Sequence, residues 1–320
     1  MSVTEIQRGV HRIGAKYGEG LFVFLYVVKG DRLALIDTGT VQHPQAFIQP
    51  ALAQLGMALS DVDLILNTHA HFDHVGGNLE VKRASDARIY VHSGDAAQAG
   101  SIEAQVEYMT APLRALGLPD AAVRQRADFV RAMAGEAAGA DVMISEGDAV
   151  DLGGGITLKA IHTPGHTPGC ISYYWESEGV LFSGDAIQGL GGTPGDTPYY
   201  FDACSYRRTL STVLELKPHI LCTGHAYFMR GYPTEPTLRG ADAKAFLDGA
   251  VELADTIHRA VEAAVSRMPR AAKGDIALEA MWELAYRYPL RLMRETRLPR
   301  SAGPTLLTHI EAVLAGSYPA

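Results

Sequence analysis

The chain has few cysteines, no long hydrophobic run and no excess of positive charge. Its three cysteines, Cys170, Cys204 and Cys222, are too widely spaced for a disulfide framework and are typical of a reducing compartment. The longest apolar run, residues 21–28, is far shorter than the roughly 20 residues that cross a bilayer as a helix. The first five residues do not resemble a signal peptide. We therefore expect a cytoplasmic protein without a membrane partner.

The charge balance indicates what kind of partner the chain binds. Its 36 acidic residues outnumber 28 lysines and arginines, so the formal net charge is -8. Proteins that bind a phosphate backbone usually carry a basic surface, so we expect a small-molecule substrate and no nucleic acid. With 320 residues, 47% of them hydrophobic, the chain can bury a full core in one large or two smaller domains.

Short β-rich runs alternate with a segment of helical spacing near the N-terminus, and further β-rich runs follow in the middle of the chain. Residues 33–37 and 63–67 predict strands, and residues 45–55 between them predict a helix. Such alternation favours an α/β sheet with covered faces. Further strands are predicted at 10–13, 21–28, 88–91, 156–161, 171–175, 180–182 and 220–222, and a helix at 206–216.

Two stretches interrupt this alternation. Residues 94–140 are rich in Ala, Arg and Glu and show helical spacing, with Pro112 expected to end or kink the first helix. The chain after about residue 236 is also mostly helical. We predict a catalytic domain over residues 1–235, with a helical insert at about 94–140, and a C-terminal helical region over 236–320. Both helical parts should pack over the active edge as a lid or as the contact of a homodimer.

Side chains of the types that bind metals are concentrated in one hexapeptide. His69 and His71 follow a predicted strand, and residues i and i+2 of an extended segment point to the same side, so both can reach one ion. Asp73 and His74 come where a helix is expected to begin, and can serve a second ion. Three single residues in later turns complete the candidate set: His166, Asp185 and His225. Imidazole with carboxylate suits zinc, and also iron, manganese or cobalt.

Histidines outside this set are expected to be structural or to lie on the surface, because an isolated histidine is rarely a ligand. These residues are His11, His43, His92, His219, His258 and His309.

The hexapeptide and the three later candidate ligands resemble the metal-binding motifs of the metallo-β-lactamase superfamily, in particular of its glyoxalase II and N-acyl-homoserine lactonase branches. Asp37 also matches the early structural aspartate of that family. The resemblance implies a four-layer αβ/βα sandwich with the metals at the edge of two packed sheets. It implies that one metal binds His69, His71 and His166, and that the other binds Asp73, His74 and His225. It also implies that Asp185 bridges the two ions.

Two divalent ions would make the protein a hydrolase in which a metal-bridging hydroxide attacks an ester, lactone or thioester carbonyl. Asp185 would hold the pair of ions, and Asp73 or water would protonate the leaving group. Tyr199, Tyr200 and Tyr227 follow ligands in the sequence, so each is a candidate donor to the substrate carbonyl. Packing in the core is the alternative role for each of them.

Other functions use the same ligands. A phosphodiesterase or nuclease is one, and an iron-dependent, sulfur dioxygenase-like redox enzyme is another; a non-enzymatic binding protein is a third. A phosphodiesterase normally adds Lys or Arg to the metals. The basic residues nearest to the motifs in sequence lie outside them: Lys82, Arg83, Arg207, Arg208 and Arg230. The β-lactamases proper lack the aspartate that Asp185 supplies. Carbonyl hydrolysis is therefore the leading prediction.

Overall fold

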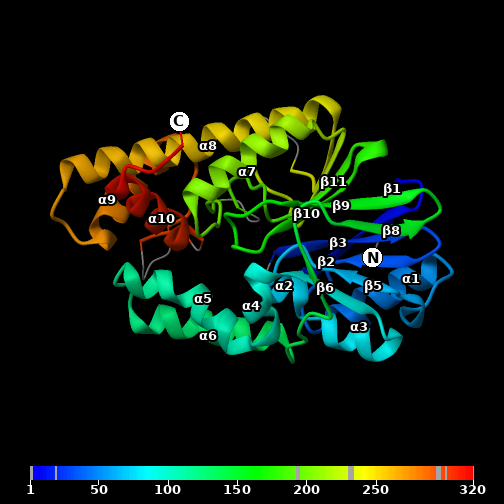
Figure 1. Cartoon of the computed structure of the whole chain (residues 1–320). Helices are drawn as coiled ribbons and strands as arrows, with labels where there is room; N and C mark the ends of the chain where they lie inside the picture. The colour runs from blue at the N-terminus through cyan, green and yellow to red at the C-terminus, as the bar shows by residue number, and fades with distance from the viewer. Residues whose placement is uncertain are drawn as a thin grey trace.

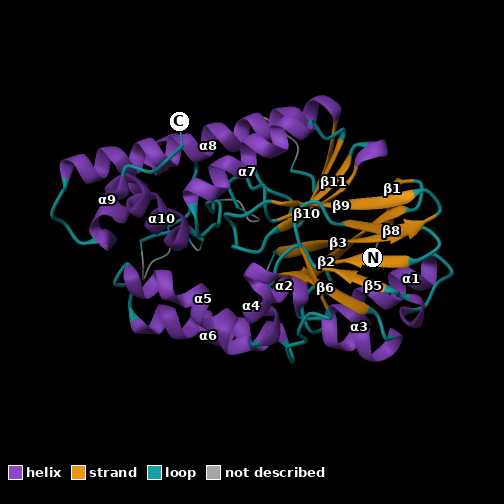
Figure 2. Ribbon diagram, viewed as in Figure 1, coloured by secondary structure: helices purple, strands orange, loops and turns teal. Residues whose placement is uncertain are grey.

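The computed structural model describes residues 3–18, 20–191, 195–229, 234–292, 297–299 and 301–319. Two β-sheets pack face to face, and helices cover their outer faces (Figure 1, Figure 2). The first sheet contains, in spatial order, β1 (Val3–Gln7), β2 (Val10–Tyr17), β3 (Leu21–Lys29), β4 (Leu33–Ile36), β5 (Leu64–Leu66), β6 (Arg88–His92) and β7 (Val142–Ile144).

The second sheet joins strands from the middle of the chain with one from the C-terminal region. Its order is β13 (Thr237–Arg239), β12 (Ile220–Thr223), β11 (Val180–Gly184), β10 (Ile171–Trp175), β9 (Ile156–His162) and β8 (Ala149–Gly153). β11 and β12 run parallel, so their C-terminal ends lie together. β13 falls after the predicted boundary at residue 235, yet pairs with β12. The sheet therefore extends slightly into the region predicted to be helical.

The central strands show why the sequence forms two buried sheets. All four residues of β4 are buried, and β4 and β5 pair in parallel. Ala34 and Ile36 face the second sheet, while Leu33 and Leu35 pack on the opposite face, under helices. Strands covered on both faces are apolar throughout rather than alternating.

Helices form the two outer layers. Those on the first sheet include a π-helical turn (Pro44–Ile48), α1 (Gln49–Gln54), α2 (Phe72–Val75) and α3 (Asn78–Ser85). Those on the second sheet include α7 (Ala203–Leu216) and α8 (Gly240–Arg267). The predicted four-layer αβ/βα sandwich is thus confirmed. Short 3₁₀ turns occur at Leu59–Asp61, Ser93–Asp95 and Glu176–Glu178.

The insert forms α4 (Ala96–Gly100), α5 (Ile102–Ala115) and α6 (Asp120–Ala134). α5 continues through Pro112 and ends one turn later, where Leu116 N–H donates to the Pro112 carbonyl. Proline lacks an N–H group, so it is tolerated near a helix end more readily than at the centre. The expected break therefore comes three residues after Pro112.

The C-terminal helices pack against the insert. α9 (Lys273–Arg287), α10 (Ala302–Ala315) and the second half of α8 share one apolar cluster with Leu116. At Gly303 an added Cβ would lie 2.9 Å from the Leu113 side chain, so α10 touches α5 closely. Helices α5 and α6 of the insert and α9 and α10 of the C-terminal part lie beyond the same ends of the sheets (Figure 1). None of the described helices combines the length and apolarity needed to cross a membrane.

Candidate metal centre

The predicted ligands meet at one edge of the sandwich because they follow strands that end there. His69 and His71 lie in the loop after β5, and Asp73 and His74 lie in α2. The others come from the second sheet: His166 between β9 and β10, Asp185 directly after β11, and His225 after β12. Pockets in α/β proteins commonly form where strand ends converge.

The seven side chains converge into overlapping groups, each with its ligand atoms within 4.8 Å of one another. The groups are His69, His71 and His166; His69, His74 and Asp185; and Asp73, His74 and His225.

Asp185 lies between the two predicted triads. Its Oδ2 is 3.6 Å from His166 Nε2 and 3.3 Å from His225 Nε2. Its Oδ1 is 3.6 Å from His74 Nε2. One carboxylate therefore faces both groups, which is the position that the resemblance implied for a bridging ligand.

Buried polar atoms without partners show that the cluster fits a cation. His74 Nε2 and Asp185 Oδ1 are both buried and lack hydrogen-bond partners among the described residues, and His71 Nε2 does too. Each such group costs about 1–3 kcal/mol if nothing satisfies it. Gly224 keeps the space clear, because a Cβ there would lie 2.4 Å from Asp185 Oδ1 and 2.8 Å from His74 Cε1. Imidazole and carboxylate donors in this arrangement suit a divalent transition metal.

Outer hydrogen bonds orient the imidazoles. His74 Nδ1 donates to Asp37 Oδ2 at 2.8 Å, and His225 Nδ1 donates to the Phe22 carbonyl at 2.5 Å. His166 Nδ1 donates to the Tyr199 carbonyl at 2.5 Å. When Nδ1 carries the proton, Nε2 is left with its lone pair towards the cluster, as metal-binding histidines require.

The protonation states also suit metal binding. Burial, reinforced by neighbouring imidazoles, lowers the pKa of His69 and of His71, so both rings are neutral. Burial disfavours charge on Asp73 and Asp185, but His225 and His74 outweigh it and hold the pKa of both carboxyls below the usual range. Neutral imidazoles with ionised carboxylates are the ligand forms. Burial disfavours charge on His74 and His225, but Asp185 outweighs it and raises the pKa of both rings, so a bound metal must displace a proton from each of them.

Asp95 is a functional residue that the sequence reasoning missed. Its carboxylate accepts from Ala70 N at 2.9 Å, from Thr167 Oγ1 at 2.7 Å and from Gly169 N at 2.7 Å. It thereby joins the loop that holds His69 and His71 to the loop that holds His166. Nothing in the sequence around Asp95 signals this role, because it depends on two loops from different sheets.

A cavity of about 100 Å³ opens beside the ligands. The Tyr17 hydroxyl donates to Asp73 Oδ2 at 2.5 Å in its wall. Tyr199 and Tyr227 also line it. The Tyr227 hydroxyl has no hydrogen-bond partner among the described residues. Burial first, and then Asp185, raises the pKa of Tyr227, so it keeps its proton and is available as a donor.

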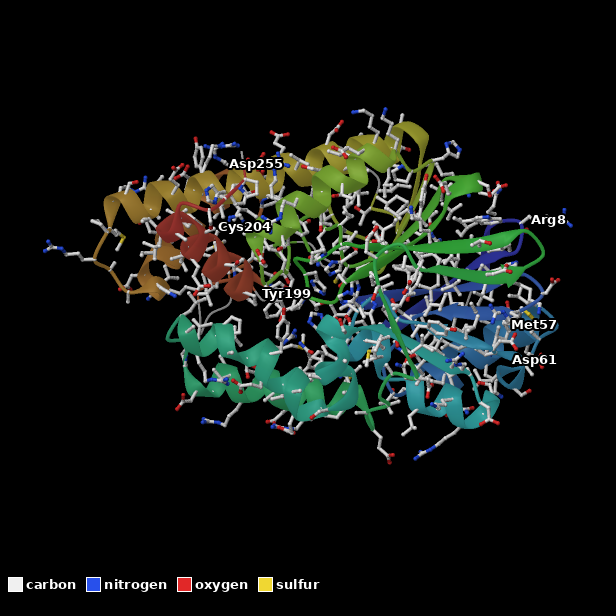
Figure 3. The ribbon with its side chains drawn as sticks, viewed as in Figure 1. Arg8, Met57, Asp61, Tyr199, Cys204 and Asp255 are labelled. Atoms are coloured by element: carbon white, nitrogen blue, oxygen red, sulfur yellow. The ribbon has the colours of Figure 1, made fainter. Side chains whose placement is uncertain are left out.

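Tyr200 is not part of this cavity, so its prediction as a substrate residue is wrong. Its ring is fully buried and stacks on Tyr206 at 4.0 Å, and its hydroxyl lies 2.7 Å from His309 Nε2. Successive side chains of an extended segment point to opposite sides. Tyr199 and Phe201 accordingly lie near His71, with ring centroids 6.0 and 5.9 Å away. Figure 3 shows Tyr199 between the two helical regions.

The cavity also holds a cation that sequence reasoning missed. Arg126, from α6, lines the cavity, and its Nη2 donates to the Tyr199 hydroxyl at 3.2 Å. Arg126 is not among the basic residues that lie near the motifs in sequence. Sequence distance hid Arg126, because the insert folds back over the site. Of the basic residues considered from the sequence, Arg230 lies outside the described residues.

Comparison with known proteins agrees with this site. A family model described as the metallo-beta-lactamase superfamily matches residues 18–225, well over half of the chain. A hydroxyacylglutathione hydrolase of Rhodospirillum rubrum is 31% identical over 151 residues, which cover 46% of this chain and 44% of that protein. A beta-lactamase-like protein 2 homolog of Drosophila melanogaster is 29% identical over 204 residues, which cover 61% and 55%. The chain thus spans about half the length of these curated relatives.

A solved structure shows the same fold. A metallo-beta-lactamase family protein from Thermus thermophilus has a TM-score of 0.72 and 22% identity, covering 98% of this chain and 95% of that one. The chain belongs to the metallo-beta-lactamase superfamily. Its His–Asp cluster together with this membership implies that it binds divalent metal.

Proposed function

We propose that the chain is a dinuclear metal-dependent hydrolase that cleaves an ester, lactone or thioester bond. The observation that carries this proposal is the position of Asp185, whose two oxygens face both ligand groups. Zinc is the expected metal, with iron or manganese as alternatives. When bound, two such ions supply a water of lowered pKa and polarise a carbonyl oxygen.

Side chains around the ligands have separate tasks in this reaction. Asp73 is held by the Tyr17 hydroxyl at the cavity wall, and we assign to it the relay of a proton from the attacking water to the leaving group. The Tyr227 hydroxyl is protonated and unpaired among the described residues, so it can donate to the substrate carbonyl oxygen as negative charge builds there. Phe72 and Phe129 form an apolar part of the wall, which limits the access of water.

The relatives and the cavity support a small carbonyl substrate. The Rhodospirillum relative is named for the hydrolysis of a glutathione thioester, and ester and lactone cleavage pass through the same tetrahedral intermediate. A cavity of about 100 Å³ suits a compact acyl group at the ligands. Larger parts of a substrate would extend outside it.

The test combines metal analysis with a substrate panel. Purified protein should contain close to two transition-metal ions per chain. Lactones, thioesters, aryl esters and aryl phosphodiesters should then be compared by kcat/KM at the same metal loading. We expect at least one carbonyl substrate to be cleaved at least tenfold faster than the phosphodiester. Cleavage of none of the carbonyl substrates by metal-loaded protein would refute the proposal.

Arg126 favours one alternative, a phosphodiesterase. A guanidinium in the cavity could stabilise the charge that builds on phosphoryl oxygens. The same panel decides between the two functions. If the phosphodiester is preferred tenfold, about 1.4 kcal/mol of transition-state stabilisation, the phosphodiesterase replaces the carbonyl hydrolase.

A further inference from the structure

Arg126 provides the only lysine or arginine side chain that lines the cavity in the described part of the chain. It comes from the helical insert rather than from the sandwich that supplies the metal ligands. Neither the metal centre nor the reaction proposed above gives this cation a task. Its surroundings show what it can bind.

Aromatic rings surround the guanidinium and leave most of its donors unused. Its Cζ lies 5.4 Å from the ring centroid of Tyr199, 5.8 Å from that of Phe72 and 6.0 Å from that of Phe129. The bond to the Tyr199 hydroxyl is its one hydrogen bond within the described residues. A guanidinium carries five N–H donors, so several remain.

A second arginine on the same helix has the usual carboxylate partner. Arg131, at the surface, donates through Nε and Nη2 to the two oxygens of Glu103, at 2.8 Å each. No described carboxylate lies within 4.0 Å of the Arg126 guanidinium. A charge that is partly removed from water normally has a counter-ion.

Carboxylates of the cavity wall already have other partners. Asp73 and Asp185 belong to the metal-ligand cluster. Asp196 accepts from Thr197 N at 2.9 Å and from Ser301 N at 2.9 Å, so its carboxylate is held by the backbone. Among the described residues, no carboxylate of the wall therefore pairs directly with Arg126.

We propose that Arg126 binds a carboxylate of the substrate. The planar fork of a guanidinium matches the two oxygens of a carboxylate, and dehydration by neighbouring rings strengthens that pair. A phosphate dianion normally requires further donors, and the described wall offers no second cation. The natural substrate is then an ester or thioester that carries a free carboxylate near its scissile carbonyl. This inference rests on the proposed hydrolase and refines its specificity.

Tyr199 positions the guanidinium. Its hydroxyl accepts from Nη2 while its backbone carbonyl accepts from His166 Nδ1. The same residue thus connects the anion subsite to a metal ligand, which places a bound carboxylate close to the reacting carbonyl.

The experiment uses two pairs of thioesters that differ only in charge. One pair carries the charge on the leaving group: the S-acetyl thioesters of 3-mercaptopropionate and of 3-mercaptopropionamide. The other carries it on the acyl group: a monothioester of adipate with its second carboxylate free, and the same thioester with that carboxylate replaced by a primary amide. The metal-loaded wild-type enzyme should prefer the anion by at least about tenfold in kcat/KM in one pair, mainly through KM.

Variants of α6 residues test whether Arg126 causes the preference for the anionic thioester. Arg126→Met should lower kcat/KM for the preferred anionic thioester about 30-fold and change the neutral partner less than about threefold, with unchanged metal content. Arg126→Lys keeps the charge without the fork and should recover part of the loss. Arg124→Met, at an exposed position of the same helix, is the matched control and should behave as wild type. Equal losses on the charged and neutral thioesters, or no preference in either pair, would overturn the assignment.

A binding measurement separates this inference from the proposed function. Adipate should raise the melting temperature of the metal-loaded wild type and not that of Arg126→Met. A larger rise with inorganic phosphate than with adipate would overturn the choice of carboxylate. If neither charged nor neutral thioesters are hydrolysed while adipate still binds through Arg126, the hydrolase proposal fails and the anion subsite stands.

Discussion

Two clusters of buried or half-buried histidines occupy different parts of this molecule. The cluster at the sandwich edge contains five imidazoles, and some of its nitrogens have no hydrogen-bond partner among the described residues. The cluster in the C-terminal helices contains His258 and His309. There His309 Nε2 lies 2.7 Å from the Tyr200 hydroxyl, and the two Nδ1 atoms are 3.2 Å apart.

The two histidine clusters differ in the carboxylates that lie beside them. At the sandwich edge Asp73 and Asp185 converge with the imidazoles. Near His258 the Tyr318 ring stacks at 3.8 Å, and Asp255 pairs with Arg207 at 2.9 Å and with the Tyr318 hydroxyl at 3.0 Å. Burial alone therefore does not make a metal site. Unpaired ring nitrogens that converge with free carboxylate oxygens do.

The largest effect is expected from replacing the aspartate that faces both ligand groups. Asp185→Asn should release metal and lower kcat/KM at least about 100-fold, because the loss of an outer partner already costs 10–100-fold. Metal content and hydrolysis are measured together. Asp255→Asn, beside the C-terminal histidines, is the control and should keep its metal. Wild-type metal content and activity in Asp185→Asn would remove the bridging role.

Metal removal should affect only the sandwich-edge cluster. Adding zinc to chelator-treated protein at 100 times the dissociation constant stabilises by about 2.7 kcal/mol. For a chain of this size we expect the melting temperature to rise by roughly 5 °C. His309→Gln should show the same rise, since that ring is already satisfied. If the melting temperature of His309→Gln does not rise when zinc is added, the metal binds at the C-terminal histidines instead.

A smaller effect should come from filling the space beside the ligands. Gly224→Ala puts a methyl group 2.4 Å from Asp185 Oδ1, so the carboxylate must move and metal affinity should fall about 10–100-fold. Gly249→Ala in α8 meets only the Met229 side chain, at 3.4 Å, and should be neutral or stabilise by about 0.5–1 kcal/mol. Metal titration and thermal unfolding of both variants test this contrast.

The smallest effect concerns the pH dependence of the C-terminal cluster. Burial first, and then His258, lowers the pKa of His309 well below its usual value, so the folded chain keeps it neutral. The unfolded chain binds a proton there near pH 6.5, so stability should fall as the pH drops below about 6.5, by up to about 1.4 kcal/mol per pH unit. Metal-loaded His309→Gln should have a shallower slope in denaturant unfolding. Equal slopes for variant and wild type would contradict this prediction.

The first four candidate ligands and the sheet-forming strands could be read from the sequence because both depend on local order. His69 and His71 share one side of an extended segment, and Asp73 with His74 begins the next helix, so four ligands lie together before any long-range contact forms. The apolar strands between glycine turns likewise indicate a covered sheet. The later ligands His166, Asp185 and His225 could be assigned only by their resemblance to a known order.

Tertiary packing decided what surrounds those ligands. Tyr199 and Tyr200 are neighbours in sequence, yet one lines the cavity and the other contacts His309, because their side chains leave the loop on opposite sides. Arg126 and Asp95 reach the site from elements that carry no motif, and only the folding of the insert and loops brings them there. The sequence by itself thus determined the first four candidate ligands, whose spacing is local. The wall that selects a substrate came from contacts between distant segments, whose geometry no local pattern encodes.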